Sequence, residues 1–136
     1  MIVDAKNMIA GRLATRVAKL ALLGNTIQVI NAEKAVITGK PQMVIDKFLA
    51  KVRKGSIRKG PYYPRHPDRL LRRIIRGMLP HRQEKGKLAY KRVMCYIGAP
   101  AELKETPVIF KESDVKKVKR TTYITLADLS VGLGVK

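Results

Sequence analysis

Apolar residues recur along this chain with two alternating periods, and the alternation predicts strands separated by helices. Residues 2–5 and 26–30 are short apolar or β-branched runs, which are typical of strands. Between them, residues 10–23 carry apolar side chains at helical spacing, and Gly24 follows where a helix C-cap is expected. A strand, a helix and a second strand in this order predict a βαβ unit with parallel strands.

The rest of the pattern predicts further elements of both kinds. Proline suits the first turn of a helix, so Pro41 and Pro67 mark the expected starts of two more helices. Thr125 is placed to N-cap a short final helix. The other expected strand segments are 35–38, 93–97, 108–110 and 121–124, with a helical turn at 88–91 and the final helix at 126–133. This alternation predicts an α/β sandwich around a small, mainly parallel sheet.

The helix that begins at Pro67 has two sharply different faces. Apolar positions recur on one face, and arginines without any acid fill the positions between them. Like charges at helical spacing repel, so this arginine face indicates contact with an external anion. The apolar stripe is Leu70, Leu71, Ile74, Ile75, Met78 and Leu79, and the arginine face is Arg69, Arg72, Arg73 and Arg76.

The composition points to a polyanion as the partner. The 136 residues include 29 Lys and Arg against 10 Asp and Glu, a net charge of +19, while the 46% hydrophobic fraction still allows a normal core. Nucleic acid is the first candidate, and an anionic membrane surface is the second. Lys and Arg interrupt every apolar run, so we expect no membrane span, and residues 1–12 lack a signal-peptide core. We expect one cytosolic domain over residues 1–136, with a C-terminal extension at 99–136.

Two further helices carry basic stripes opposite their apolar faces, and a long loop joins the second of them to the arginine helix. The stripes are spaced at i, i+4 and i+7, which places each on one side of its helix. Solvated surface lysines are the simpler interpretation of any one position. The loop at 55–67 mixes cationic and flat side chains, which suits phosphate contact and stacking on unpaired bases, or else a flexible tip with locally packed tyrosines. The residues are Arg12, Arg16 and Lys19, then Lys47, Lys51 and Lys54, and in the loop Arg58, Lys59, Tyr62, Tyr63, Arg65 and His66.

The sequence does not match the catalytic and cofactor-binding motifs that we considered. Thr38-Gly39-Lys40 resembles part of a Walker loop, but Lys34 stands where the first glycine is needed and Pro41 where Ser or Thr is needed. A dinucleotide fingerprint needs three spaced glycines, and Gly11 stands alone. The single Cys95 cannot form an intramolecular disulfide or a thiolate metal cluster. We therefore expect no enzyme, metal, cofactor or small-molecule substrate.

The two histidines leave one alternative open. His66 and His81 sit in basic loops, and Asp68 is the one nearby carboxylate that could orient a general base. A nuclease with a basic cleft is thus an unfavoured alternative. The absence of a helix-turn-helix, zinc finger or heptad signature favours RNA over DNA, since RNA is met by shape, phosphate contact and stacking.

Several short motifs stand out in the chain up to Gly98. They are Asp4-Ala5, Gly11-Arg12-Leu13-Ala14, Leu23-Gly24, residues 29–34, Thr38-Gly39-Lys40, residues 76–80, Gly86, Ala89, Tyr90, Val93 and Tyr96-Ile97-Gly98. Together they resemble the universal L-thirteen family of large-subunit ribosomal proteins. The linker at 54–71 is similar to the archaeal and eukaryotic branch more than to the bacterial one.

This resemblance implies a three-layer α/β/α sandwich with a mainly parallel four-stranded sheet, and no catalytic residue. It implies a structural constituent of the cytoplasmic large ribosomal subunit that binds and helps assemble ribosomal RNA beside neighbouring proteins. An RNA-binding translational regulator acting off the ribosome is the alternative. In the motif, Gly77 and Gly98 are expected to allow close approach or a turn, Met78 and Leu79 to fill the core, and Pro80 to end the helix. Besides the stripes, loop and arginine face, the expected RNA-binding residues are Arg82, Lys87, Lys91 and Arg92.

Overall fold

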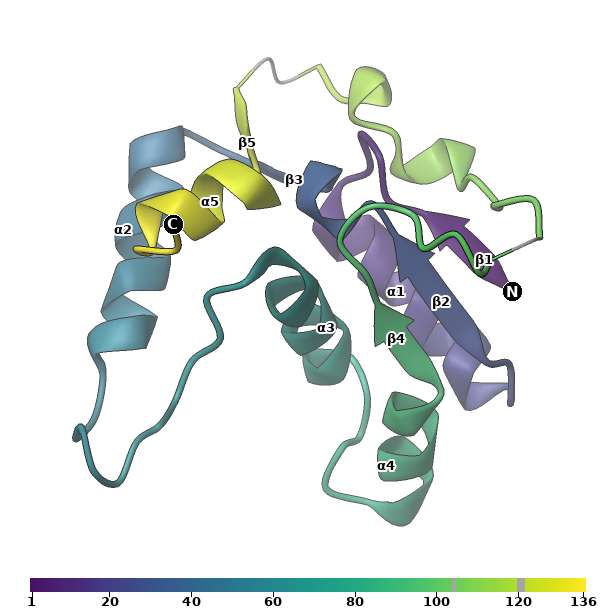
Figure 1. Cartoon of the computed structure of the whole chain (residues 1–136), viewed down its shortest axis with the longest axis horizontal. Coiled ribbons are helices and arrows are strands. Elements are labelled where there is room, and N and C mark those ends of the chain that lie inside the picture. Colours follow the sequence, from purple (N-terminus) through teal and green to yellow (C-terminus); the bar gives the residue numbers. More distant parts are fainter. Residues whose placement is uncertain (104, 120–121) are drawn as a thin grey trace.

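The computed structural model describes residues 1–103, 105–119 and 122–136, and strands and helices alternate in it up to residue 53 (Figure 1). The βαβ unit is confirmed, whereas the helical turn expected at 88–91 is part of a longer helix that begins at Glu84. In chain order the elements are β1 Ile2–Asp4, α1 Ala10–Leu22, β2 Ile27–Ile30, the 3₁₀ turn η1 Ala32–Lys34, β3 Val36–Thr38, α2 Pro41–Arg53, α3 Pro67–Gly77, α4 Glu84–Lys91, β4 Val93–Cys95, the 3₁₀ turns η2 Lys111–Ser113 and η3 Val115–Lys117, β5 Tyr123–Thr125 and α5 Leu126–Gly132.

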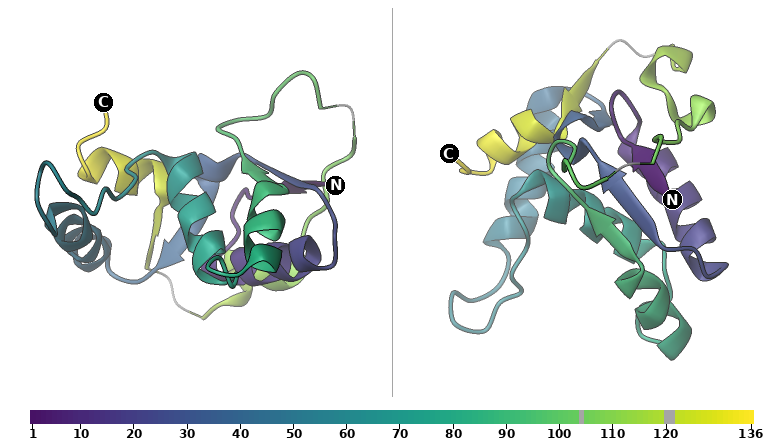
Figure 2. Two further views of the ribbon diagram at one scale, coloured as in Figure 1. Left: turned by 90° about the horizontal axis from the view of Figure 1, so that it is seen from below. Right: turned by 45° about the vertical axis from the view of Figure 1, so that its right-hand side comes forward.

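The main sheet has β2 at its centre. Within the described ranges its order is β1-β2-β4, and both pairings are parallel, with Val3 opposite Val29 and Val29 opposite Cys95. One face is fully buried, because Val3, Ile27, Val29 and Val93 each have 0% exposure. Helices α1, α3 and α4 pack together on this face (Figure 2).

The other two strands form a separate antiparallel pair, so the predicted single four-stranded sheet is wrong. Ile37 of β3 lies opposite Ile124 of β5. Only residues 31–35 separate β2 from β3, whereas a parallel crossover needs about a dozen residues or more. Strand β3 therefore turns away, and its Val36 N–H donates to the Met8 carbonyl at 2.9 Å just beyond β1. The fold is mixed α/β with a small, mostly parallel sheet, and the three-layer arrangement is not confirmed.

The C-terminal segment completes the core. Ile124, Leu126, Leu129 and Leu133 are 0–4% exposed, and α5 packs against α2, α3 and η1. Thr125 caps α5 as predicted, since its Oγ1 accepts a hydrogen bond from the Asp128 N–H at 3.1 Å. The predicted strand at 121–124 is found as β5 from Tyr123 onward, and its Thr121 lies outside the described residues.

The end of α3 corrects two expectations. Helix α3 stops at Gly77, and Met78 follows as the C-cap with 41% exposure, so it does not fill the core. Leu79 does, at 4%. Gly77 has an ordinary helical backbone, and a β-carbon added there would meet no atom within 4 Å, so no close approach requires it. Gly98 does occupy a turn, with φ of +68°.

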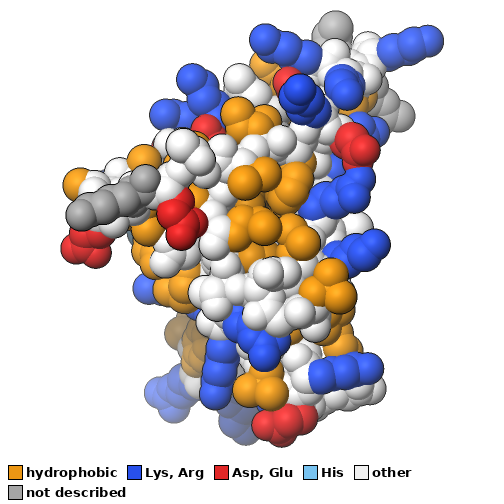
Figure 3. All heavy atoms as spheres, turned by 90° about the vertical axis from the view of Figure 1, so that its right-hand side faces the viewer, with side chains coloured by type: hydrophobic (Ala, Val, Ile, Leu, Met, Phe, Trp, Pro, Cys, Tyr) orange, Lys and Arg blue, Asp and Glu red, His pale blue; other side chains and the backbone are white. Residues whose placement is uncertain are grey.

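One face of the molecule differs from the rest in its chemistry. On the side that carries the N-terminus, hydrophobic side chains gather in the centre, and Lys and Arg lie mainly around the margins (Figure 3). Ile97 and Ile109 are 56% and 60% exposed in the segment that follows β4. None of the helices formed by the described residues is both long and apolar enough to span a bilayer.

Candidate nucleic-acid interface

The sequence-predicted cations divide by exposure. Most are exposed, including all six in the stripes of α1 and α2 and the three in the loop at 55–67. The half-buried members of the predicted set are Tyr63, Arg72, Arg73, Arg76 and Arg92. Half-burial brings these side chains close to other groups of the chain, so those with defined partners are described separately.

Arg72 and Arg92 have intramolecular partners. The Arg72 Nε donates to the Val93 carbonyl at 3.0 Å, and its guanidinium lies over the Tyr90 ring at 4.4 Å from the centroid. Arg92 donates to the Ala21 carbonyl at 3.2 Å. These contacts join α3 to α4 and β4, and α4 to α1. Arg72 thus belongs to the arginine face of α3, but its contacts lie within the protein and support the fold.

Tyr63 joins α2 to α3. Its ring meets Phe48 of α2 edge-on, with centroids 6.1 Å apart and planes at 69°. The Lys51 ammonium lies 4.9 Å from the Phe48 centroid, and the Arg73 guanidinium lies 5.5 Å from that of Tyr63. Burial raises the pKa of Tyr63, although Arg73 and Arg76 act to lower it, so the phenol is neutral at physiological pH. This cluster holds the end of the loop between two basic helices.

The loop itself has a defined conformation. Ser56 and Gly60 exchange main-chain hydrogen bonds of 3.0 and 2.8 Å, which close its tip. A β-carbon on Gly55 would lie 2.2 Å from the Gly60 carbonyl oxygen, so the loop needs glycine there. The single hydroxyl hydrogen of Tyr62 is shared between the carbonyls of Ile57 and Arg58, at 3.1 and 2.7 Å, while Tyr62 remains 71% exposed. Tyr63 thus packs against α2, whereas Tyr62 is held by hydrogen bonds within the loop and stays exposed.

The structure thus brings many of the predicted residues onto one surface, which we call the α2–α3 basic surface. In Figure 1 this surface lies on the left, and α1 lies on the other side of α3 from α2. Arg53 also belongs here, because it lines a hollow of about 410 Å³ with Lys54, Tyr62 and Arg65. Arg53 was not predicted, because it lies off the i, i+4 and i+7 stripe of Lys47, Lys51 and Lys54. Shared hollows and contacts with Tyr63 group Lys47, Lys51, Arg53, Lys54, Tyr62, Arg65, Arg69, Arg73 and Arg76. We add Arg58 and Lys59, which are exposed in the loop between the two helices.

The α1 stripe lies apart from this surface and is partly neutralised. Arg16 forms an ion pair with Glu112 of η2, and Arg12 donates to the Glu112 carbonyl at 3.4 Å. Lys19 is exposed in the last turn of α1, where a cation is favourable beside the helix C-terminus. Arg82, Lys87 and Lys91 are exposed in and just before α4.

Several motif residues have structural roles. A β-carbon on Gly86 would lie 2.0 Å from the Pro80 carbonyl oxygen, so only glycine allows the chain before α4 to fold back on it. The Gly98 N–H donates to the Glu33 carboxylate at 3.0 Å, and the Asn31 N–H donates to the Gly98 carbonyl at 2.9 Å. Asn31 also donates from its side chain to Asp4 at 2.9 Å. Asn31 thus links the first of the short motifs to the last.

The remaining reactive groups form no catalytic arrangement among the described residues. His81 Nδ1 lies 3.3 Å from the Leu79 carbonyl, and His66 is exposed. Burial raises the pKa of the Cys95 thiol to about 12, so the thiol is protonated and unreactive. No cluster of three or more His, Cys, Asp or Glu side chains occurs in ranges 1–103, 105–119 and 122–136 that could hold a metal ion.

Comparison with known proteins gives consistent matches. The family model described as ribosomal protein L13 matches residues 1–102. The chain is similar to the large ribosomal subunit protein uL13 of Methanopyrus kandleri, with 44% identity across 98% of this chain and 86% of the relative. It is 46% identical to the uL13 protein of Picrophilus torridus, across 97% of this chain and 95% of the relative. For the uL13 protein of Methanosarcina barkeri the identity is 41%, across 99% and 98%.

Proposed function

Because the chain belongs to the ribosomal protein L13 family, we propose that it is a structural constituent of the large ribosomal subunit in the cytoplasm. The relatives carry the name of large ribosomal subunit proteins, and a structural protein of this kind performs no catalysis. Its task is to bind large-subunit ribosomal RNA and to hold converging RNA segments during and after assembly. The single observation that carries this proposal is the α2–α3 basic surface on a folded α/β core.

The α2–α3 basic surface suits RNA for two reasons. It combines two helices with an irregular loop, so it matches an irregular fold of phosphates better than a straight groove. Tyr63 holds these three elements together through Phe48 and Arg73, so the surface exists before RNA arrives. A preformed site loses less conformational entropy on binding. With a net charge of +19, the protein should release many counterions, and its affinity should fall steeply with salt.

The predicted residues outside this surface contribute in a second way. Lys19, Lys87 and Lys91 are exposed on α1 and α4, and we assign them peripheral phosphate contacts. Arg72 and Arg92 act mainly inside the protein, where they position α3 and α4 through the carbonyls of Val93 and Ala21. We assign these two a structural role, which refines the assignment made from sequence.

The hydrophobic face in Figure 3 suits a protein neighbour better than RNA. Exposed Ile97 and Ile109 offer no phosphate contact, and apolar groups gathered on a surface commonly mark protein contacts. We therefore orient the molecule with its α2–α3 basic surface toward RNA and this face toward another large-subunit protein.

The proposal is tested by sedimentation of cell extracts through sucrose gradients in high salt. We expect the protein to remain with the large subunit. Recovery in the soluble fractions at the top of the gradient, with ribosomes intact, would instead place the protein off the ribosome. Crosslinking in purified subunits then identifies the contacts, and RNA adducts should map to α2, the 55–67 loop and α3.

A further inference from the structure

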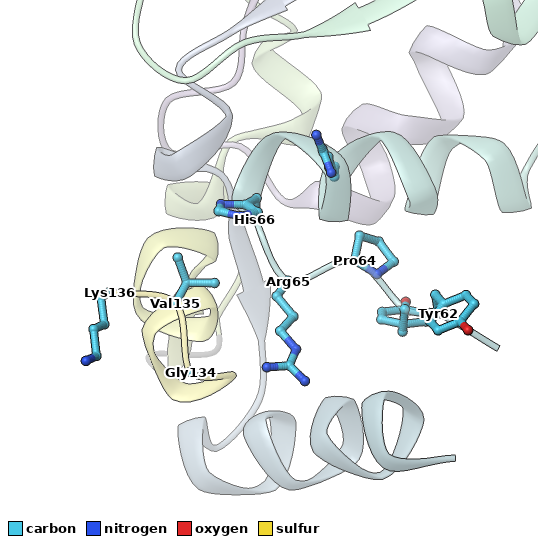
Figure 4. A pocket seen from close by; sticks show the side chains of 9 residues that line it. Tyr62, Pro64, Arg65, His66, Gly134, Val135 and Lys136 are labelled. Atoms are coloured by element: carbon cyan, nitrogen blue, oxygen red, sulfur yellow. The ribbon is translucent and has the colours of Figure 1, made fainter. Parts of the chain in front are cut away.

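A hollow opens between the end of the loop and the last residues of the chain. Its volume is about 650 Å³, within the range of about 300–1,000 Å³ typical of small-ligand sites. Figure 4 shows Tyr62 and residues 134–136 on opposite sides, with Arg65 between them. Residues that line it are Tyr62, Tyr63, Pro64, Arg65, His66, Arg69, Gly134, Val135 and Lys136.

The electrostatics of the hollow favour an anion. Every charged side chain that lines it is cationic, namely Arg65, Arg69 and Lys136. Helix α3 also begins here at Pro67, and its N-terminal dipole adds to the positive potential, although Asp68 in the first turn offsets part of it. The hollow therefore suits a small ligand that carries negative charge.

Tyr62 provides the flat surface. Its side chain is 71% exposed, and an exposed aromatic ring on a loop would normally be mobile. Here the hydroxyl is fixed by the carbonyls of Ile57 and Arg58, and the ring lies so close to Gly60 that a β-carbon there would be 3.1 Å from its Cδ2 atom. The ring is therefore held in place while its outer side remains available for stacking.

Arg65 is positioned from the C-terminal side. The buried Ser130 of α5 donates its hydroxyl hydrogen to the Arg65 carbonyl at 2.8 Å. The Arg65 guanidinium also lies close to Gly134, because a β-carbon on Gly134 would be 3.8 Å from its Nη1 atom. The C-terminal segment, which lies beyond the residues matched by the family model, thus fixes one side of the hollow.

We propose that this hollow binds one unpaired RNA nucleotide, whose base stacks on Tyr62 and whose phosphate meets Arg65 and Arg69. This inference rests on the proposed function and specifies one part of it. A paired base cannot stack on the ring, because its own neighbours cover both of its faces. The hollow therefore distinguishes a nucleotide turned out of an RNA helix from the helix itself.

Ultraviolet crosslinking in intact large subunits tests where the base lies. Trypsin releases residues 60–65 as one peptide, Gly-Pro-Tyr-Tyr-Pro-Arg, so after nuclease digestion mass spectrometry can locate a nucleotide adduct on Tyr62 or Tyr63. We expect the adduct on Tyr62. Adducts on α2 and α3 without any on this peptide would overturn the nucleotide site and leave the proposed function standing.

Binding measurements with deproteinised large-subunit ribosomal RNA supply the second test. Tyr62→Ala should weaken binding by roughly 5- to 150-fold without changing the salt slope, because stacking releases no counterions. Tyr62→Phe keeps the ring and should lose much less. A fully paired RNA duplex should bind the wild type and Tyr62→Ala equally. Equal binding of both proteins to ribosomal RNA would overturn the site, whereas failure of the wild type to bind ribosomal RNA would overturn the proposed function itself.

Discussion

The guanidinium of Arg72 lies 4.4 Å from the centroid of the Tyr90 ring, so an arginine of the α3 basic face is bound within the protein. The same side chain donates to the Val93 carbonyl at the start of β4. Its neighbour Arg69 is exposed and points toward the hollow beside the loop. Two arginines on one helix face thus serve stability and binding respectively, and this division can be measured.

Replacing Arg72 with Gln should destabilise the fold. The variant loses the contact with Tyr90 and the hydrogen bond to Val93, which together contribute about 1–3 kcal/mol. Urea unfolding followed by circular dichroism measures the difference. Arg69→Gln is the matched control and should change stability by about 0.5 kcal/mol or less. Equal stability of both variants would contradict the structural role of Arg72.

Replacing Arg69 and Arg76 together with Gln should weaken RNA binding while leaving the fold intact. Each lost phosphate contact lowers the magnitude of the salt slope, d log K/d log[salt], by about 0.7–0.9. Filter binding to ribosomal RNA at several salt concentrations gives this slope. An unchanged slope would show that neither arginine contacts a phosphate.

Gly86 and Gly77 belong to the same short motif region, and the structure predicts opposite responses to alanine. Gly86→Ala places a β-carbon 2.0 Å from the Pro80 carbonyl oxygen, so we expect a loss of about 1–3 kcal/mol or more in unfolding free energy. Gly77→Ala meets no atom within 4 Å and should leave stability unchanged or raise it by up to about 1 kcal/mol. Thermal melts of the two variants side by side decide the matter.

Cys95 should respond to pH in a defined direction. Burial raises the pKa of its thiol from 9.0 to about 12, so the unfolded chain loses this proton before the folded one does. The contribution of Cys95 to stability is thus complete below pH 9 and declines as the pH rises from 9 to 12. The difference in unfolding free energy between the wild type and Cys95→Ala should shrink over this interval. Iodoacetamide should modify the native thiol far more slowly than the unfolded one at pH 8.

The C-terminal helix should be part of the same cooperative unit as the rest of the chain, and we propose that residues 1–136 form one domain. Leu129 is fully buried, so Leu129→Ala should cost about 2–5 kcal/mol and lower the midpoint of a single transition. Val131 is 68% exposed on the same helix, and Val131→Ala should have little effect. Two separate transitions in calorimetry would show that the C-terminal segment folds on its own.

Local patterns in the sequence were sufficient for the helices and for the βαβ unit. Leu13 and Val17 repeat at helical spacing, and the run from Ile27 to Ile30 is β-branched, so each element is determined by residues near one another. The pairing of Ile37 with Ile124 was missed, because no local signal connects segments at opposite ends of the chain. The short interval between β2 and β3 was available in the sequence and would have excluded parallel pairing.

The sequence was sufficient to predict which segments of the candidate interface carry basic residues, but not which of their side chains face solvent. Basic stripes and the mixed loop identify which segments carry charge. They do not show that Arg72 contacts Tyr90 of α4 within the protein. Nor do they show that Tyr63 packs against Phe48 while Tyr62 remains exposed. Such distinctions depend on tertiary packing, which the charge pattern of one helix does not contain.

The antiparallel pair of β3 and β5 has a consequence for synthesis of the chain. As translation proceeds from the N-terminus, Val36 and Ile37 emerge early, but their partners in β5, Thr125 and Ile124, are made much later. The nascent protein therefore exposes an unpaired strand and an incomplete core until its final helix is available. A strongly basic chain in that state is prone to nonspecific contact with the RNA around it, so we expect native folding and correct RNA recognition to become possible together, once β5 and α5 have been made.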